Sequence, residues 1–515
     1  MDLKHLFTWG LLSLAAASVL TRVCLPAQRH RHPVLHWATD DSPVKRWEIA
    51  PFKSWLRRHR YPVFTIRIDS ANDTSTKDLI EGISGDGDDL MDMYGFGQAD
   101  FMQRCGLLHN VASEAGKMDF GADRTWSGLR AQILHAGKQY LFPDNASPLL
   151  YWVDRATFAK YHQPVPPRRW TFAEFQRRGL AFVRAANPPG RRRKIFFANA
   201  VDTRFMRRSL GLSIFNETLT RCILDDPRYI RVLRLMRRWI FRDRLLPTPA
   251  ELSALATRPI ALGFGGSSIQ LFSVGRCAML YTGLWGLVQL RRFYRTRGAI
   301  PLAVSDPPCG GFPNAVMVMR GTAIYRGSTH NELAAYFLAY LASRTYNLRV
   351  VEAADSLPPI PRYTWRRRFL DPPQYPNEAG CAAAFARAAR AIGIPTVQSP
   401  FILGATVNRI VRTEAEGGFV AGIYTARQAA RLAAKRINQH IASNVRRSRR
   451  LGELYETLRR QQRTIDDLRQ ERRNVPLRLI RNPFYRRYYV AQGWASDVST
   501  TAAGYDIQKH IIKGP

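Results

Sequence analysis

Aromatic side chains gather at the ends of predicted strands: Trp37, Tyr94, Phe96, Trp152 and Trp285. In open α/β sheets, ligands bind beyond the carboxyl ends of the strands. Flat aromatic faces with carboxylates nearby suit pyranose rings, whose C–H faces stack while their hydroxyls take hydrogen bonds. The shared placement of these aromatic residues therefore favours a carbohydrate-binding site.

The residues that could carry catalysis or hold a metal lack the spacing that either would need. The glycine-rich run 263–268 lacks the lysine that a phosphate-binding loop requires, and it does not match the G-x-S-x-G elbow of a nucleophilic serine. The carboxylates at 86–89 miss the spacing of a calcium loop, and no carboxylate pair stands out for acid–base roles. The six cysteines form no C-x-x-C pair. We therefore predict no enzyme activity, no metal and no cofactor.

The chain of 515 residues has a formal net charge of +37, from 77 basic and 40 acidic residues. Such a charge first suggests nucleic acid or an anionic surface as a partner. However, 66 of the basic residues are Arg, and the charge is spread out, with only +9 in the last 75 residues. Nucleic-acid binders usually gather their charge on one face or arm. We therefore do not predict nucleic acid as a partner.

Two α/β units position these residues. The segments 34–38, 62–68 and 90–94 read as strands that alternate with helices, a pattern typical of a layered α/β unit with a parallel sheet. Strands expected near 194–198, 277–281 and 300–304 form a second unit of the same kind. The hydrophobic content of 46% excludes wholesale disorder.

The amino terminus has the features of an export signal. Lys4 precedes an apolar run at 6–20, which Arg22 ends, and this run is shorter than a bilayer span of about 20 residues. We predict a signal peptide or an N-terminal anchor over residues 1–25, and whether it is cleaved stays open. The body is then periplasmic or extracytoplasmic.

The carboxyl terminus, 441–515, is predicted to be a basic helical tail. A capping box at 425–428 opens a long helix that is interrupted near 443–450. The heptad pattern beyond this interruption has two polar breaks. The helix could therefore pack on the body of the protein or form a marginal dimer seam, and the sequence does not decide between the two. The aromatic patch 484–489 could stack bases or lie at a membrane surface, but docking on the body is the commoner use of such residues.

The order of these segments resembles the family 1 extracellular solute-binding proteins of ABC importers, the group related to maltose-binding protein. The resemblance covers roughly residues 34–346. It rests on the ordered segments 35–41, 85–94 with 105–108, 149–154, 169–175, 272–279 with 283–285, and 321–341. Asp88 stands where the family usually has Pro, and the arginine content and the helical tail are atypical.

The resemblance implies a type II periplasmic-binding-protein fold, with two α/β lobes joined by hinge strands. Lobe 1 would comprise 33–147 and 305–348, and lobe 2 would comprise 150–300 and 358–440. Chain crossovers are expected near 147–153, 298–306 and 347–359.

The resemblance also implies a ligand site. By position, Asp40 and Asp41 are expected to bind sugar hydroxyls, and Tyr94 and Phe96 match a contact segment of the first lobe. Trp285 matches the aromatic platform of the second lobe, and Asp202 lies near another contact segment.

The implied function is the substrate-binding component of an ABC importer, a monomer that delivers a sugar or oligosaccharide to a permease in the inner membrane. The net charge prompts an anionic sugar, a uronate or a sulfated sugar, as one possible ligand. The alternative from another class is a cell-surface adhesion or scaffold protein that binds anionic lipid or polymer through its basic tail. A secreted hydrolase is a third alternative, and it would need a carboxylate pair.

Overall fold

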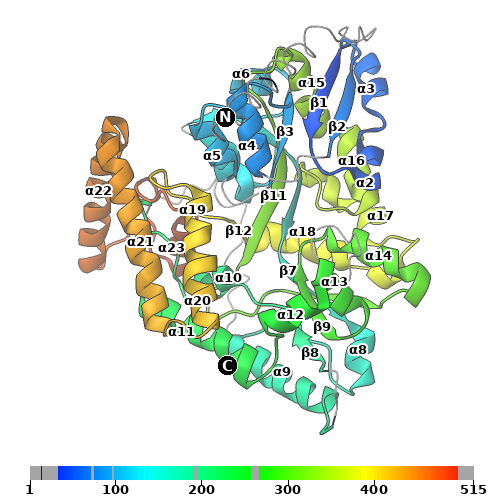
Figure 1. Cartoon of the computed structure of the whole chain (residues 1–515), viewed down its shortest axis with the longest axis vertical. Coiled ribbons are helices and arrows are strands. Elements are labelled where there is room, and N and C mark those ends of the chain that lie inside the picture. The colour runs from blue at the N-terminus through cyan, green and yellow to red at the C-terminus, as the bar shows by residue number, and fades with distance from the viewer. Residues whose placement is uncertain are drawn as a thin grey trace, which may run out of the picture.

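A computed structural model describes Ser13 and residues 33–496, apart from 71–74, 95–97, 136, 191–193 and 257–265. Phe96, the end of the tail and, except for Ser13, the expected signal or anchor segment lie outside the described residues. Two sheets dominate the molecule, the first in the upper part of Figure 1 and the second in the lower part. The α/β character predicted from the sequence is thereby confirmed.

The first sheet has the strand order β12-β11-β3-β1-β2. β6 also pairs with β11, on the side opposite β3. Its strands are β1 (Val34–Ala38), β2 (Thr65–Asp69), β3 (Leu90–Tyr94), β6 (Leu141–Pro148), β11 (Ala315–Ile324) and β12 (Gly393–Pro395). As predicted, β1 runs parallel to β2 and β3. The helices around this sheet are α2 (Pro43–Ile49), α3 (Phe52–Arg58), α4 (Ser75–Ser84), α5 (Gln98–Arg104), α6 (Ala112–Lys117), α7 (Arg130–Ile133), α15 (Asn331–Ala342) and α16 (Arg344–Ala353).

The second sheet has the order β10-β7-β9-β8, with β8 and β9 parallel and β7 antiparallel to β9. Its strands are β7 (Leu150–Asp154), β8 (Phe196–Ala198), β9 (Cys277–Thr282) and β10 (Leu302–Ser305). Its helices include α8 (Arg155–Lys160), α9 (Phe172–Ala186), α10 (Thr203–Ser209), α11 (Pro227–Arg237), α12 (Pro249–Ala256), α13 (Gly266–Ser273) and α14 (Gly286–Arg297). A capping box of Thr171 and Glu174 opens α9.

The chain passes from the first sheet to the second at Leu149, between β6 and β7. The Leu149 N–H donates to the carbonyl of Val316, 2.9 Å away, so the crossing residue is held against β11. This crossover falls within the expected segment 147–153, and the return runs between β10 and β11. The later strand β12 also belongs to the first sheet, so the segment 358–440 assigned to lobe 2 contains one strand of the other sheet. A strand of three residues carries too little pattern to be recognised.

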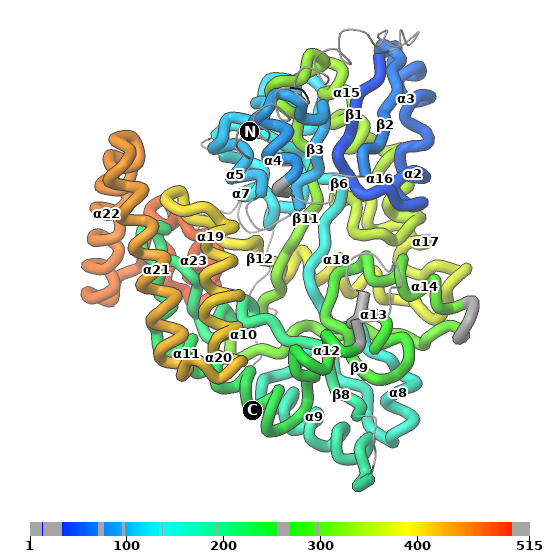
Figure 2. Tube along the Cα trace, viewed as in Figure 1, coloured from blue at the N-terminus to red at the C-terminus, as the bar shows by residue number. Residues whose placement is uncertain are grey.

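The remaining helices form two groups in Figure 2: α17 and α18 lie between the levels of the two sheets, and α19 to α23 lie on the left of the view. They are α17 (Arg367–Leu370), α18 (Cys381–Ala391), α19 (Gly404–Asn408), the π-helix η5 (Arg409–Glu416), α20 (Gly417–Val420), α21 (Ala426–Arg447), α22 (Arg449–Gln470) and α23 (Pro483–Gln492). The break between α21 and α22 lies at Ser448, whose hydroxyl accepts from the Leu451 N–H and starts the second helix.

The described part of the tail packs on the body. Phe484, Tyr485 and Tyr489 are buried in a cluster that also holds residues of the second sheet. The Tyr489 hydroxyl donates to Glu217, 2.7 Å away. These aromatic residues are therefore not available to stack bases or to enter a membrane surface, and docking on the body is confirmed. Among the described residues, no helix has the length and apolar character to cross a membrane.

Candidate functional site

Polar side chains meet at the carboxyl edge of the first sheet. Asp40 follows β1, Tyr94 ends β3, and Arg320 lies opposite Tyr94 in the antiparallel strand β11. The Tyr94 hydroxyl donates to Asp40 Oδ1 at 3.2 Å, and Arg320 Nη1 lies 2.7 Å from the same oxygen. The strand pairing thus brings two of the predicted site residues, Asp40 and Tyr94, into direct contact.

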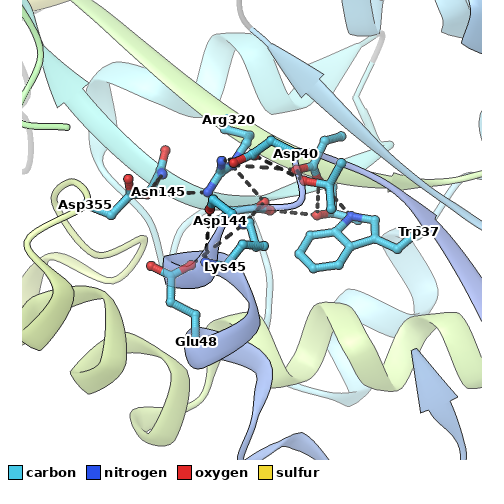
Figure 3. A network of polar contacts seen from close by, with 12 residues as sticks. Trp37, Asp40, Lys45, Glu48, Asp144, Asn145, Arg320 and Asp355 are labelled. Atoms are coloured by element: carbon cyan, nitrogen blue, oxygen red, sulfur yellow. Dashed lines mark hydrogen bonds and ion pairs between the residues drawn. The ribbon is translucent and has the colours of Figure 1, made fainter. Parts of the chain in front are cut away.

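Arg320 is the centre of a buried charge network (Figure 3). Its guanidinium lies 3.3 Å from Asp144, 3.4 Å from Asp355 and 3.6 Å from Asp92. Asp92 and Asp144 are also joined through the Thr322 hydroxyl, which lies 2.8 Å from Asp92 and 2.7 Å from Asp144. The network fixes β3, β6 and β11 relative to one another behind the exposed Asp40.

A second buried cation supports the network from α2. Lys45 is 1% exposed, and its Nζ lies 3.2 Å from Asp144 and 3.8 Å from Glu48. The helix that carries it begins after Ser42, whose hydroxyl accepts from the Lys45 N–H. The fully buried Glu48 carboxyl accepts no hydrogen bond on either oxygen.

The network holds more carboxyl groups than cations, and burial decides which of them stay ionised. Burial raises the pKa of Glu48 to about 8 and that of Asp92 to about 7. For Asp40, burial acts in the same direction, but Arg320 and Lys45 outweigh it and lower the pKa to about 2. Asp40, 37% exposed, is therefore a permanently charged acceptor at the surface of the network. A carboxylate of this kind can accept hydrogen bonds from the hydroxyl groups of a ligand.

Asp41, the next residue, has a different environment. Its two oxygens accept from Arg46, both partners lying on the protein surface. The sequence placed Asp40 and Asp41 side by side, but only Asp40 joins Tyr94 and Arg320.

The two predicted residues of the second sheet lie at its carboxyl edge. Asp202 follows β8 and is 3% exposed; it caps α10 by accepting from the Arg204 N–H at 2.8 Å. The Arg204 guanidinium, 2.6 Å away, outweighs the effect of burial and lowers the pKa of Asp202. Trp285 precedes α14, is half-buried, and lays its ring against Gly283, where a side chain would collide with it.

The carboxyl edges of the two sheets point toward the same crossover. In the first sheet, Tyr94 at the end of β3 pairs with Arg320, and Pro148 at the end of β6 pairs with Met317. In the second sheet, Leu150 at the start of β7 pairs with Thr282 at the end of β9. Because Leu149 joins these two edges, the residues that follow β1 and β3 and those that follow β8 and β9 lie on the side where the units meet. Asp40 and Tyr94 contact each other in lobe 1, while Asp202 and Trp285 stand at the corresponding edge of the second sheet.

Sequence reasoning missed Arg320, Lys45 and Asp144. One signal for Arg320 was present, because it is the only charged residue in the otherwise apolar run of β11. Such an isolated charge in a buried strand must be paired. Lys45 had no comparable signal, since a lysine in a basic helix reads as exposed. In the described ranges, no group of three or more His, Cys, Asp or Glu residues is arranged to hold a metal ion.

Comparison with solved structures identifies the architecture. An ABC substrate-binding protein from Listeria monocytogenes, in complex with cycloalternan, matches with a TM-score of 0.65 and 17% identity over 80% of this chain and 99% of that one. An ABC transporter solute-binding protein from Thermotoga lettingae, bound to α-D-tagatose, gives a TM-score of 0.62 and 14% identity over 79% and 99%. The chain shares the fold of these proteins.

A third neighbour is the maltose/maltodextrin-binding domain from Bdellovibrio bacteriovorus bound to maltotriose. It has a TM-score of 0.58 and 14% identity, over 80% of this chain and 100% of that one. No protein-family model and no curated protein matches the sequence. The two-lobed fold expected from the resemblance, followed by helices at the carboxyl terminus, is confirmed. Hereafter lobe 1 and lobe 2 mean the units built on the first and the second sheet.

Proposed function

We propose that the chain is the substrate-binding component of an ABC importer that captures a sugar or oligosaccharide between its two lobes. The observation that carries this proposal is the contact of Asp40 with Tyr94 and Arg320 at the edge of lobe 1 that faces lobe 2. An ionised acceptor beside an aromatic ring is the chemistry that binds a pyranose. The neighbours of the same fold carry sugars in their structures, which supports the assignment.

In this proposal each lobe supplies part of the site. Asp40 accepts from sugar hydroxyls, the Tyr94 ring packs on the sugar, and Trp285 offers a platform in lobe 2. Asp41, Asp202 and Phe96 remain predicted contacts; the oxygens of Asp41 and Asp202 are bound to Arg46 and Arg204 in this structure. Ligand that contacts both lobes stabilises the closed state through its differential affinity, and the permease then recognises that closed shape.

The remaining parts of the assignment follow from this role. We propose that the protein acts outside the cytoplasm, delivers its ligand to a permease in the inner membrane, works as a monomer and has no catalytic step. The alternative is an adhesion protein that binds lipid or polymer through its tail. The burial of Phe484, Tyr485 and Tyr489 counts against it, because these side chains cannot contact such a partner.

The test combines a ligand screen with a measurement of shape. Thermal-shift screening of the purified protein against a broad panel of mono- and oligosaccharides is expected to find a stabilising sugar, because a ligand that binds only the folded state raises the melting temperature. Small-angle scattering is expected to show compaction with that sugar. Mass spectrometry of any co-purifying ligand would name it directly. Neither stabilisation nor compaction with any sugar of the panel would contradict the proposal.

A further inference from the structure

One buried arginine of lobe 2 has no hydrogen-bond or ion-pair partner among the described residues. Arg207 on α10 is 5% exposed, and its Nε is enclosed without a hydrogen bond. Within the described residues, neither a hydrogen bond nor an ion pair reaches its guanidinium. Burial lowers the pKa of Arg207. Tyr229 and the nearby carboxylates of Glu416 and Asp202 act in the opposite direction without a hydrogen bond or ion pair to it, and the group stays charged. A buried guanidinium normally keeps a partner, since an unpaired buried charge is strongly destabilising.

Its neighbours on the same helix show what satisfied arginines look like here. Arg208 is 2% exposed and donates to the carbonyls of Ile394 at 3.1 Å and Pro395 at 2.5 Å. Arg204 donates three side-chain hydrogen bonds to the carboxylate of Asp202. Arg207 and Arg208 are thus adjacent in sequence and both buried, but in the described part of the chain only the guanidinium of Arg208 donates hydrogen bonds.

Arg207 lines a cavity between α10 and the segment 396–412. The cavity has a volume of about 60 Å³. Four arginines line it, Arg204, Arg207, Arg208 and Arg412, and no acidic side chain does. This space is sufficient for a few water molecules or a small anion. Arg412 is about half exposed, so the charged lining reaches the protein surface.

We propose that this cavity is an anion site in which Arg207 binds an oxyanion: a carboxylate, sulfate or phosphate group. The planar guanidinium matches two oxygens of such a group, which gives short, charge-assisted hydrogen bonds. Arg412 adds positive charge at the exposed side, and the oxyanion supplies the partner that Arg207 lacks.

The anion has two possible sources. The cavity adjoins α10, which begins just after the carboxyl end of β8, on the edge of lobe 2 that faces lobe 1. The oxyanion can therefore be the acidic group of a bound sugar, and for this source the inference rests on the proposed function. The same chemistry also describes a free inorganic anion, which binds independently of any sugar.

The experiment measures melting temperature and binding heat for the purified protein. The probes are sodium sulfate and sodium phosphate, compared with sodium chloride at equal ionic strength, and trigalacturonate compared with the neutral galactotriose. We expect sulfate or phosphate to raise the melting temperature by about 2 °C or more at saturation. We expect Arg207→Met to weaken this binding at least tenfold, as the loss of charge-assisted hydrogen bonds implies.

The variant also has a distinctive effect without ligand. Because Arg207 is buried and unpaired, Arg207→Met is expected to raise the melting temperature in anion-poor buffer. The matched control is Arg291→Met, which does not line the cavity and removes the ion pair of Arg291 with the buried Glu378. It is expected to lower the melting temperature in every buffer while leaving the sulfate-induced shift in place. Arg412→Ala, at an exposed position, is a second variant that folds and is expected to weaken the anion several-fold.

The outcomes separate the two proposals. A rise in melting temperature with sulfate and phosphate that depends on Arg207 supports the site. If trigalacturonate binds more tightly than galactotriose, and Arg207→Met removes that difference, the anion is the acidic group of the sugar. Equal binding of the two trisaccharides assigns it to a free ion. No anion-dependent shift in the wild type, or an unchanged shift in Arg207→Met, overturns the site whatever neutral sugars do. Conversely, neutral and acidic sugars that all fail to bind count against the proposed function alone.

Discussion

At the scale of single residues, Asp40 is the side chain on which sugar binding should depend most. Its oxygens are held by Arg320 and Tyr94 while over a third of the side chain remains exposed. We expect Asp40→Asn to weaken sugar binding about 10- to 100-fold, because a charge-assisted hydrogen bond contributes on the order of 1.5–3 kcal/mol. Titration calorimetry with the sugar found in the screen measures this loss.

The matched control is Asp41→Asn at the adjacent position. Both Asp41 oxygens are taken by Arg46, so its loss of affinity is expected to be much smaller. Equal losses for the two variants would contradict the different roles assigned to Asp40 and Asp41.

Glu48 gives the protein a stability that depends on pH. Burial raises its pKa to about 8 in the folded state, so between the unfolded value of about 4.3 and pH 8 the folded chain binds the extra proton. Stability from this group is therefore present at low pH and is lost as the pH rises toward 8. Glu48→Gln stays neutral at every pH. We therefore expect its free energy of unfolding, relative to that of the wild type, to be higher at pH 8.5 than at pH 5.5.

Urea unfolding at the two pH values measures that difference, which is expected to be on the order of a few kcal/mol. Glu352→Gln is the control, because Glu352 is a half-exposed glutamate. A Glu48→Gln protein whose stability follows the wild type across the whole range would show that Glu48 titrates as an exposed group does.

At the scale of elements, α23 is fixed to lobe 2 by one buried amide. Asn482 Nδ2 donates to Ser213 Oγ at 3.0 Å and to the carbonyls of Phe215 and Asn216, while its Oδ1 accepts from the Phe484 N–H. We expect Asn482→Ala to lower the free energy of unfolding by about 2–4 kcal/mol, because it leaves buried carbonyls unpaired and removes a helix cap.

Urea unfolding measures the loss, and limited proteolysis shows whether the tail is released. Asn110→Ala is the control, since Asn110 is an exposed residue that accepts from the Ala112 N–H. If the two substitutions lower the free energy of unfolding equally, Asn482 does not hold the tail on lobe 2.

The elements were predictable where local patterns determine them. The capping boxes of Thr171 and Thr425, the Ser42 cap and the first parallel strands all rest on residues close in sequence, and the structure contains them. β12 was missed because its three residues become a strand only through pairing with β11.

The site was predictable in part for the same reason. Asp40 and Tyr94 could be placed at strand ends, because a strand pattern fixes where its carboxyl end lies. Their contact with Arg320 depends on the register of two strands 221 or more residues apart, Leu90–Tyr94 and Ala315–Ile324, and no local pattern contains that register. The cavity around Arg207 likewise needs two segments far apart in the chain.

At the scale of the whole molecule, a side chain of lobe 1 contacts the segment that precedes α19. Arg104 on α5 donates to the carbonyl of Pro400 at 2.5 Å and to that of Ser399 at 3.4 Å. We expect Arg104→Ala to shift the ligand-free protein toward a more open arrangement. The variant loses both hydrogen bonds, and the loss of even one, about 0.5–1.5 kcal/mol, changes the ratio of closed to open molecules roughly 2- to 10-fold.

Small-angle scattering is expected to show a larger radius of gyration for Arg104→Ala without ligand, and calorimetry a matching loss of sugar affinity. Arg130→Ala is the control, because Arg130 bonds to a carbonyl within its own lobe, that of Asp123. An unchanged radius in Arg104→Ala would show that this contact does not bias the lobes.

The position of β11 also sets the order in which the molecule can be assembled during synthesis. β11 lies between β3 and β6, yet it is made about 170 residues after β6 ends at Pro148. At roughly 5–20 residues per second, a ribosome needs about 10–35 s to reach it. For that interval β6 has no partner and β3 keeps an open edge, so the nascent chain cannot close its amino-terminal lobe early. The amino-terminal lobe can therefore complete its sheet only after more than half of the chain has been made.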